Sequence, residues 1–395
     1  MITLLLAVIY LAFISLGLPD SLLGSAWPVM YGAFEVPVAY AGIVSMIISG
    51  GTIISSLFSS KVINKFSTGP VTFVSVAMTA LALFGFSFST QFWQICLWGI
   101  PYGLGAGSVD AALNNYVALH FKSRHMSFLH CFWGIGATVG PAIMGLCLTH
   151  NFSWNTGYRT IGMIQVVLTV FIALSLPLWK KVKPVASVGS NDAEIKSVGM
   201  VTALRHKGVI AALITFFCYC SLESTTGLWA SSYLVLKRGV DAQTAAHFAS
   251  LFYLGITLGR GLSGFVSEKL GDNKMVWIGV GIIFAGLAVL IAPLPTPFAL
   301  AALVTVGFGC APIYPSLIHA TPFLFGAEYS QTVIGMQMAC AYTGTTFIPP
   351  LFGLISLSLG ISVYPFFLLV FAVLLLSMRI FTLRPFGEAQ RQEKM

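Results

Sequence analysis

Charged residues are scarce in this chain, and their scarcity excludes a water-soluble globular protein. Asp, Glu, Lys and Arg make up 8% of the 395 residues, whereas soluble domains carry about 25%. Hydrophobic residues make up 57% of the chain, and the mean hydropathy is +0.90. This composition predicts an all-α protein that crosses a lipid bilayer many times.

Recognisable metal and nucleotide sites are also lacking. The seven cysteines lie inside or beside apolar runs without the spacing of zinc or iron–sulfur ligands, so we expect neither a metal site nor a disulfide. The sequence has no phosphate-binding glycine loop ending in Lys, which argues against ATP as an energy source. The net charge of +8 falls on loops between apolar runs, which argues against a nucleic-acid partner.

Apolar runs long enough to cross about 30 Å of hydrocarbon recur along the whole chain. The first begins almost at Met1, and no small-residue cleavage site follows it, so we expect it to be retained as a span. Twelve spans are predicted, at residues 3–31, 38–60, 70–89, 92–119, 126–148, 158–180, 208–236, 243–266, 275–293, 296–320, 331–357 and 361–383.

Positive charge is distributed unevenly between the two sets of alternating loops. Of the 20 Lys and Arg residues, sixteen lie on one side, Arg159, Lys237 and Arg238 lie on the other, and Arg260 lies within a span. Cytoplasmic loops of membrane proteins are enriched in Lys and Arg. We therefore expect a protein of the cytoplasmic membrane with both termini in the cytoplasm.

One long polar stretch, 181–207, divides the chain into parts of similar length. We interpret it as a cytoplasmic linker between an N-terminal half (1–180) and a C-terminal half (208–395) that ends in a short tail. Sequence echoes indicate an internal duplication, the clearest being Gly103-Leu104-Gly105 with Gly307-Phe308-Gly309, and Gly136, Pro141 and Gly145 with Gly344, Pro349 and Gly353. Such a six-plus-six repeat is typical of transporters whose halves rock about a central site.

Three carboxylates, Asp20, Asp110 and Glu223, lie inside apolar runs. A charge at the bilayer centre costs about 2.5 to 3.5 kcal/mol on insertion scales, so these residues are candidates for function. A carboxyl group removed from water can load and unload a proton under a proton gradient. For Asp20 the alternative is a structural role, in which it hydrogen-bonds the backbone near Pro19.

Several motifs together match a known pattern. One is the loop Gly264-Phe265-Val266-Ser267-Glu268-Lys269-Leu270-Gly271, preceded by Gly259-Arg260; others are Asp20, Gly103-Leu104-Gly105 with Asp110 to Val117, His130 to Ala137, and Tyr314-Pro315-Ser316. In these segments the chain resembles the major facilitator superfamily, and within it the fucose, galactose and hexose proton symporters. The resemblance implies twelve transmembrane helices in two six-helix halves.

The resemblance also implies roles for individual residues. Asp110 matches the acid of span 4, so it is the predicted proton carrier, with Asp20 and Glu223 as further coupling candidates. His130 stands in place of a Gln and Trp133 in place of an Asn, and these departures bear on the identity of the substrate more than on the mechanism. The loop residues implied in conformational change are Gly264, Glu268, Lys269, Gly271 and Arg260.

Polar and aromatic side chains inside the spans are the predicted substrate contacts. Asn114 can meet sugar hydroxyl groups as donor and acceptor, although hydrogen bonding between helices is the alternative. Glu223 has three candidate roles, namely binding hydroxyl groups, carrying a second proton and holding Na⁺. For Arg260, pairing with an acid or with carbonyl groups at the cytoplasmic end of span 8 is favoured over contact with the ligand. The predicted contacts are Asn114, Asn115, His130, Trp133, Glu223, Trp229, Tyr314 and Gln337.

These observations favour a monomeric secondary transporter that imports a neutral sugar or polyol together with H⁺, or alternatively Na⁺, and needs no cofactor. A proton-antiport exporter of a drug-like or metabolite solute would suit the same acids and aromatic residues. A membrane-embedded acid–base enzyme is a weaker alternative, since neither a Ser/His/Asp nor a metal-ligand spacing is present. A sensor that does not transport is the remaining alternative.

The charge bias predicts that both termini and the 181–207 linker face the cytoplasm. Single cysteines at positions 190 and 392 of a cysteine-free variant are expected to resist an impermeant thiol reagent in intact cells and to react after permeabilisation. Labelling at position 190 in sealed cells would contradict the twelve-span topology.

Overall fold

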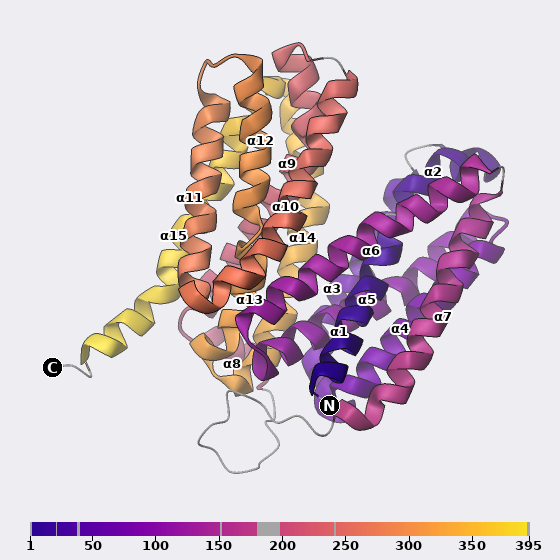
Figure 1. Ribbon diagram of the computed structural model, residues 1–395, viewed down its shortest axis with the longest axis horizontal. Coiled ribbons are helices and arrows are strands. Elements are labelled where there is room, and N and C mark those ends of the chain that lie inside the picture. The colour runs from indigo at the N-terminus through magenta and orange to yellow at the C-terminus, as the bar shows by residue number, and fades with distance from the viewer. Residues whose placement is uncertain are drawn as a thin grey trace. The chain divides into compact units, whose positions relative to one another are not determined.

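The computed structural model describes residues 2–20, 22–37, 40–150, 152–179, 198–240 and 242–392. Within these ranges the chain is helical and contains no strand (Figure 1). The predicted linker lies outside the described residues as far as residue 197. The chain divides into two compact units, of which unit 1 comprises Met1–Phe121 and Phe128–Ser197, and unit 2 comprises Lys122–Ser127 and Val198–Met395.

Unit 1 is built from the first six spans, and α1 and α2 both belong to the first span. The helix α5 packs on both α3 and α4, and α4 packs on α7. The described helices are α1 (Ile2–Asp20), α2 (Leu22–Ala33), α3 (Ala41–Phe66), α4 (Thr68–Phe88), α5 (Phe92–His120), α6 (Ser123–Thr149), whose first turn belongs to unit 2, and α7 (Trp154–Trp179).

Unit 2 repeats this arrangement with the last six spans. The helix α12 packs on α10 and α11, as α5 does on α3 and α4 in unit 1, and α9 packs on α14 and α15. The described helices are α8 (Met200–Arg205), α9 (Val209–Arg238), α10 (Ala242–Leu270), α11 (Asp272–Ile291), α12 (Thr296–Cys310), α13 (Ile313–Phe325), α14 (Ala327–Leu359) and α15 (Tyr364–Gln392), with a 3-10 turn at Ile361–Val363.

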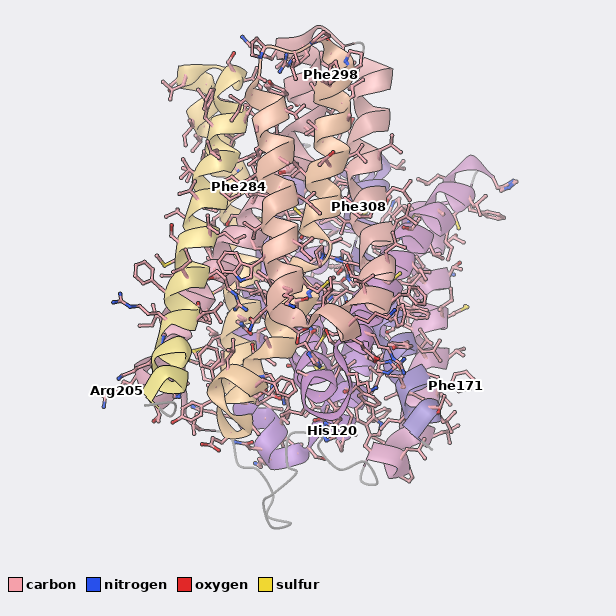
Figure 2. All side chains as sticks on the ribbon, turned by 60° about the vertical axis from the view of Figure 1, so that its left-hand side comes forward. His120, Phe171, Arg205, Phe284, Phe298 and Phe308 are labelled. Carbon is pink, nitrogen blue, oxygen red and sulfur yellow. The ribbon has the colours of Figure 1, made fainter. Side chains whose placement is uncertain are left out.

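The lengths and composition of these helices agree with a protein that spans a membrane. Ten segments in the described part of the chain are long and apolar enough to cross a bilayer. The helices α5 and α10 have 29 residues each and are long enough as well, which completes the twelve predicted spans. Large apolar side chains lie on the outer surfaces, among them Phe171, Phe298 and Phe308, each at least 40% exposed (Figure 2). Such surfaces can face the hydrocarbon core of a bilayer. Helices suit this environment because their backbone N–H and C=O groups are hydrogen-bonded within the helix.

The tenth span, predicted at 296–320, is an apolar segment of 30 residues at Thr296–Phe325, and a break at Ala311 and Pro312 separates α12 from α13 within it. Pro312 lies in the break, and a proline removes a backbone donor and clashes with the preceding turn of a helix. The break allows α13 to begin at Ile313, directly before Tyr314.

Close crossings between the second and fourth spans recur in both units. A Cβ atom added to Gly103 of α5 would lie 2.2 Å from the carbonyl oxygen of Ile48 in α3, and one added to Gly307 of α12 would lie 2.4 Å from the carbonyl oxygen of Phe252 in α10. Both distances are below the 3.0 Å that Cβ contacts respect. The repeated Gly-x-Gly sequence therefore marks the same helix packing in each half.

The first and fifth spans of each unit also meet at equivalent glycines. A Cβ on Gly136 of α6 would lie 2.3 Å from the carbonyl oxygen of Ile14 in α1, and one on Gly344 of α14 would lie 3.0 Å from the carbonyl oxygen of Phe217 in α9. The two glycines are related by the sequence repeat. These crossings bring α6 onto α1 and α14 onto α9, and thereby position the polar side chains inside each unit.

Candidate functional site

Asp110 and Asn114 form a buried pair in the middle of α5. They are four residues apart and so lie on one face of the helix. The Asn114 Nδ2 donates to Asp110 Oδ1 at 2.8 Å and to the Asp110 carbonyl oxygen at 3.0 Å. Asp110 is 4% exposed and Asn114 is fully buried. The predicted proton carrier is therefore held by an amide inside unit 1.

His130 of α6 extends this pair into a chain of three side chains. Its Nε2 lies 3.1 Å from Asn114 Oδ1. The imidazole is 5% exposed, and its edge packs on the ring of Phe13 in α1, with centroids 5.4 Å apart. Sequence analysis treated His130 as a substrate contact, and the structure connects it to Asp110 through Asn114.

Asp20, at the end of α1, lies in a second cluster of unit 1. The Trp133 indole Nε1 donates to Asp20 Oδ2 at 2.8 Å, and the Tyr102 hydroxyl lies 3.4 Å from Asp20 Oδ1. Asp20 is exposed, unlike Asp110. Side chains from the first, fourth and fifth spans thus meet at one carboxylate, and Tyr102 is a member that sequence analysis missed.

Glu223 of α9 pairs with Arg260 of α10 in unit 2. The Arg260 Nη2 lies 3.4 Å from Glu223 Oε1, and the two side chains are 6% and 20% exposed. The sequence favoured pairing of Arg260 with an acid or with carbonyl groups, and the structure pairs it with an acid. An uncompensated guanidinium among apolar helices would be costly, so this carboxylate stabilises the folded unit.

Aromatic side chains surround Arg260. Its guanidinium lies 5.8 Å from the ring centroid of Tyr314, within the range of a cation–π contact. Tyr219, one turn before Glu223 on α9, donates its hydroxyl hydrogen to the Cys310 carbonyl oxygen at 3.0 Å, where α12 ends. Of the predicted contacts in unit 2, Glu223 and Tyr314 thus lie together around Arg260.

Trp229, Gln337 and Asn115 lie apart from these clusters. The Trp229 Nε1 donates to the Pro349 carbonyl oxygen at 2.9 Å, which links α9 to α14. Gln337 Oε1 accepts a hydrogen bond from the Thr321 hydroxyl at 3.1 Å. Asn115 is buried one residue after Asn114 and so lies roughly 100° round the helix from it.

The residues predicted to form a conformational loop lie mostly within α10, at Arg260, Gly264, Glu268 and Lys269, and only Gly271 follows that helix. Gly264 is buried within α10, Lys269 is exposed, and Gly271 has a positive φ of 76° that separates α10 from α11. Glu268 pairs with Arg124 at 3.1 Å and with Lys122 at 3.6 Å. Both bases are well exposed, and exposed ion pairs contribute about 0 to 1 kcal/mol.

A second polar cluster in unit 2 was missed by sequence analysis. The Asp272 carboxylate, at the start of α11, lies 2.6 Å from His319 Nδ1 and accepts a hydrogen bond from the Ser123 hydroxyl. The neighbouring Asn273 accepts from the buried guanidinium of Arg379. These partners are far apart in sequence, and the position of Asp272 directly after Gly271 was the only signal.

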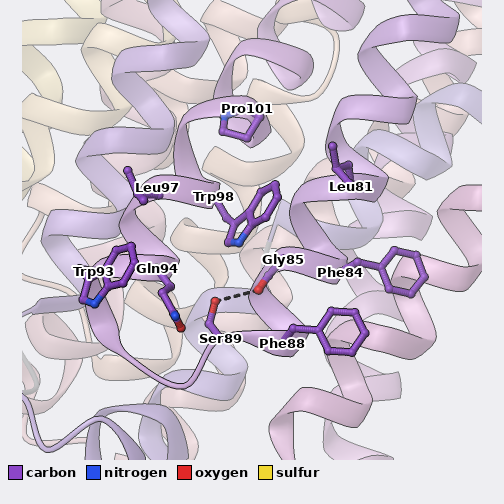
Figure 3. A pocket seen from close by; sticks show the side chains of 10 residues that line it. All are labelled: Leu81, Phe84, Gly85, Phe88, Ser89, Trp93, Gln94, Leu97, Trp98 and Pro101. Atoms are coloured by element: carbon purple, nitrogen blue, oxygen red, sulfur yellow. Dashed lines mark hydrogen bonds between the residues drawn. The ribbon is translucent and has the colours of Figure 1, made fainter.

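An apolar pocket of about 590 Å³ lies between α4 and α5 (Figure 3). Its polar side chains are already engaged, because Ser89 donates to the Gly85 carbonyl oxygen at 2.7 Å and Gln94 Oε1 caps the start of α5. Phe88, Trp93 and Leu97 are each more than half exposed. The pocket suits hydrocarbon, and it contains none of the predicted site residues.

Known proteins identify the family. A sequence model of the Major Facilitator Superfamily matches residues 9–342, which is most of the chain. The chain belongs to the Major Facilitator Superfamily. It is accordingly a multi-pass membrane transporter and not an enzyme, in agreement with the fold class that the sequence predicts.

Individual known proteins are similar to the chain over most of their length. Bypass of stop codon protein 6 of Saccharomyces cerevisiae is 22% identical, over an alignment that covers 89% of this chain and 77% of the yeast protein. The glucose/mannose transporter GlcP of Bacillus subtilis is also 22% identical, with 87% and 86% covered. A solved structure of the E. coli fucose:proton symporter FucP has a TM-score of 0.72 at 16% identity, with 95% and 98% covered.

Breaking the Glu223–Arg260 pair from either side should destabilise the transporter. Glu223→Gln and Arg260→Met are each expected to cost about 3 kcal/mol, because one variant leaves a buried cation and the other a buried carboxylate uncompensated. In the double variant the two effects should fall short of their sum by about 1 to 3 kcal/mol. Unfolding of the purified protein in detergent measures both. The control is the exposed pair Lys122 and Glu268, for which Lys122→Gln and Glu268→Gln should each cost at most about 1 kcal/mol. Strictly additive effects of the substitutions at Glu223 and Arg260 would contradict the pairing.

Proposed function

We propose that this protein is a secondary active transporter that couples the uptake of a neutral sugar or related polyol to the entry of H⁺. The observation that carries this proposal is the buried Asp110, held by the Asn114 amide within a membrane span. Supporting observations are the polar and aromatic groups near Asp20 and Glu223, and the names of relatives in the superfamily.

The partner of Asp110 suits a carboxyl group that changes its protonation state. An amide N–H can donate to an ionised carboxylate and equally to the carbonyl oxygen of a protonated carboxyl group. Loading a proton therefore keeps the 2.8 Å contact with Asn114 and removes a charge from the apolar interior. This combination is what a proton carrier needs, since neither state is left without a partner.

Glu223 is less suited to carrying the proton. Its protonation would remove the negative charge that compensates Arg260 across 3.4 Å. Because a lone buried guanidinium is costly, this proton transfer would need a second compensating charge. We therefore assign the coupling proton to Asp110, and we assign Glu223 to the orientation of Arg260 and to hydroxyl recognition. Asp20, held by Trp133 and Tyr102, remains a further candidate for coupling.

The polar and aromatic side chains and the names of the relatives both favour a sugar as the substrate. Carboxylates, amides and phenols offer the donors and acceptors that hydroxyl groups require, and indole or phenol rings can cover the apolar face of a sugar ring. The Bacillus relative is named a glucose/mannose transporter, and the E. coli structural neighbour a fucose:proton symporter. Both names support a monosaccharide as substrate.

The cellular setting follows from the charge distribution. We propose that the protein works as a monomer in the cell membrane. We place both termini in the cytoplasm, because loops rich in Lys and Arg remain on that side. We further propose that the two halves expose the site alternately to each side of the membrane, as expected for a transporter with an internal repeat.

Reconstitution into liposomes tests the proposed function directly. Radiolabelled glucose, mannose and fucose are screened by counterflow, and the best substrate is then offered with an inwardly directed gradient of two pH units. Coupling to one H⁺ supports at most about 100-fold accumulation. Asp110→Asn should abolish this accumulation and retain counterflow, since the amide replaces the carboxyl group in size and cannot carry a proton.

The control variant is Glu35→Gln, which removes an exposed carboxylate outside the helices. It should accumulate sugar like the parent. Unchanged pH-driven accumulation by Asp110→Asn would remove Asp110 from the mechanism. Accumulation that follows a Na⁺ gradient, or no exchange of any sugar in the panel, would contradict proton–sugar symport.

A further inference from the structure

The hydrogen-bond chain that starts at Asp110 ends on a titratable side chain, His130, and its direction is fixed. The Asn114 nitrogen lies within 3.0 Å of two oxygen atoms of Asp110, the carboxylate and the backbone carbonyl. The reverse orientation of the amide would place an oxygen against both acceptors. Asn114 Oδ1 must therefore face His130, where it accepts a hydrogen bond from Nε2 at 3.1 Å.

This direction determines where His130 can bind a proton. In the neutral imidazole one nitrogen is a donor and the other an acceptor. Because Nε2 carries the hydrogen that is donated to Asn114, Nδ1 is the nitrogen that gains or loses a proton. The imidazole can therefore become charged while its contact with Asn114 stays intact.

The groups packed around His130 decide how that charge interacts. From α1, Phe13 presents only an aromatic ring. From α5, the negative charge of Asp110 acts through the polar Asn114 amide, in a buried environment where charges interact strongly. Three other titratable side chains of α1 and α5 lie near α6 within about one helical turn of His130. Asp20 accepts hydrogen bonds from Trp133 and Tyr102, and Tyr10 stacks on Phe132.

We propose that His130 and Asp110 act as one proton-carrying unit, in which His130 is a second coupling residue. The inference rests on the proposed function, in that Asp110 binds the transported proton. Without that proton the unit has an ionised carboxylate and a neutral imidazole. One added proton forms an N–H bond at Nδ1 or an O–H bond at Asp110, and both arrangements have the same net charge. Two sites so connected titrate as a pair.

Substitution of His130 by glutamine separates its hydrogen bond with Asn114 from its ability to bind a proton. The side-chain amide of His130→Gln can still donate to Asn114 Oδ1 and cannot accept a proton. The pH midpoint of gradient-driven uptake by this variant should move by about one unit or more. His150→Gln, at an exposed position at the other end of α6, should leave that midpoint unchanged. An unchanged pH profile in His130→Gln would overturn the inference.

Nuclear magnetic resonance of the ¹⁵N-histidine-labelled protein in detergent tests the pairing without transport. The imidazole signal of His130 is assigned by its loss in His130→Gln, or in His130→Ala should the first variant fail to fold. Its titration midpoint should fall by about one pH unit in Asp110→Asn, because the charge that stabilises the imidazolium is gone. The same midpoint in both proteins would show that the two residues titrate independently.

The two measurements separate this inference from the proposed function. Failure of the parent protein to exchange glucose, mannose or fucose would reject sugar transport, whereas the resonance titration would still report whether His130 and Asp110 share a proton. Conversely, sugar symport with an Asp110-independent His130 signal would support the function and reject the paired unit.

Discussion

The cost of placing a charge among apolar helices is the constraint on which the rest of this structure depends. Each of the three acids inside the spans has a different kind of partner: an amide for Asp110, an indole and a phenol for Asp20, and a guanidinium for Glu223. The partner decides what a proton would do at each position. At Asp110 it removes a charge without loss of a contact, and at Glu223 it would leave Arg260 uncompensated.

Close helix packing places these partners. A Cβ on Gly17 of α1 would lie 2.2 Å from the Trp133 carbonyl oxygen of α6, so the two backbones touch next to Asp20. The same crossing continues at Gly136 and sets His130 edge-on to Phe13 and within reach of Asn114. In unit 2 the equivalent crossing at Gly344 brings α14 onto α9. Small residues therefore do more than pack the helices, because they set the distances within the polar clusters.

Sequence patterns were sufficient for most of the fold. Apolar runs predicted the spans, and the repeated glycines Gly103 with Gly307 and Gly136 with Gly344 predicted the duplication, because helix length and backbone approach are local properties. The tenth span was predicted, and the short break within it at Ala311 and Pro312 was not, although Pro312 is visible in the sequence. Prolines also lie within continuous helices here, for example Pro141 in α6, so the residue alone does not distinguish a kink from a break.

The candidate site was predictable only in part. The four-residue spacing of Asp110 and Asn114 is a local pattern that holds in any helix. By contrast, no sequence pattern predicts that Trp229 donates to the Pro349 carbonyl oxygen, or that Asp272 contacts His319, because these contacts join helices far apart along the chain. The contact of His130 with Asn114 was not predictable for the same reason, since Asn114 lies on another span.

The proposed mechanism requires H⁺ to enter together with the sugar, and the external pH reports this proton entry most directly. Proteoliposomes without an imposed gradient are suspended in weakly buffered medium, and the transported sugar is added while the external pH is recorded. With symport, a transient rise in external pH should accompany sugar entry and disappear with a protonophore. Entry of the sugar without any change in external pH would contradict proton–sugar symport.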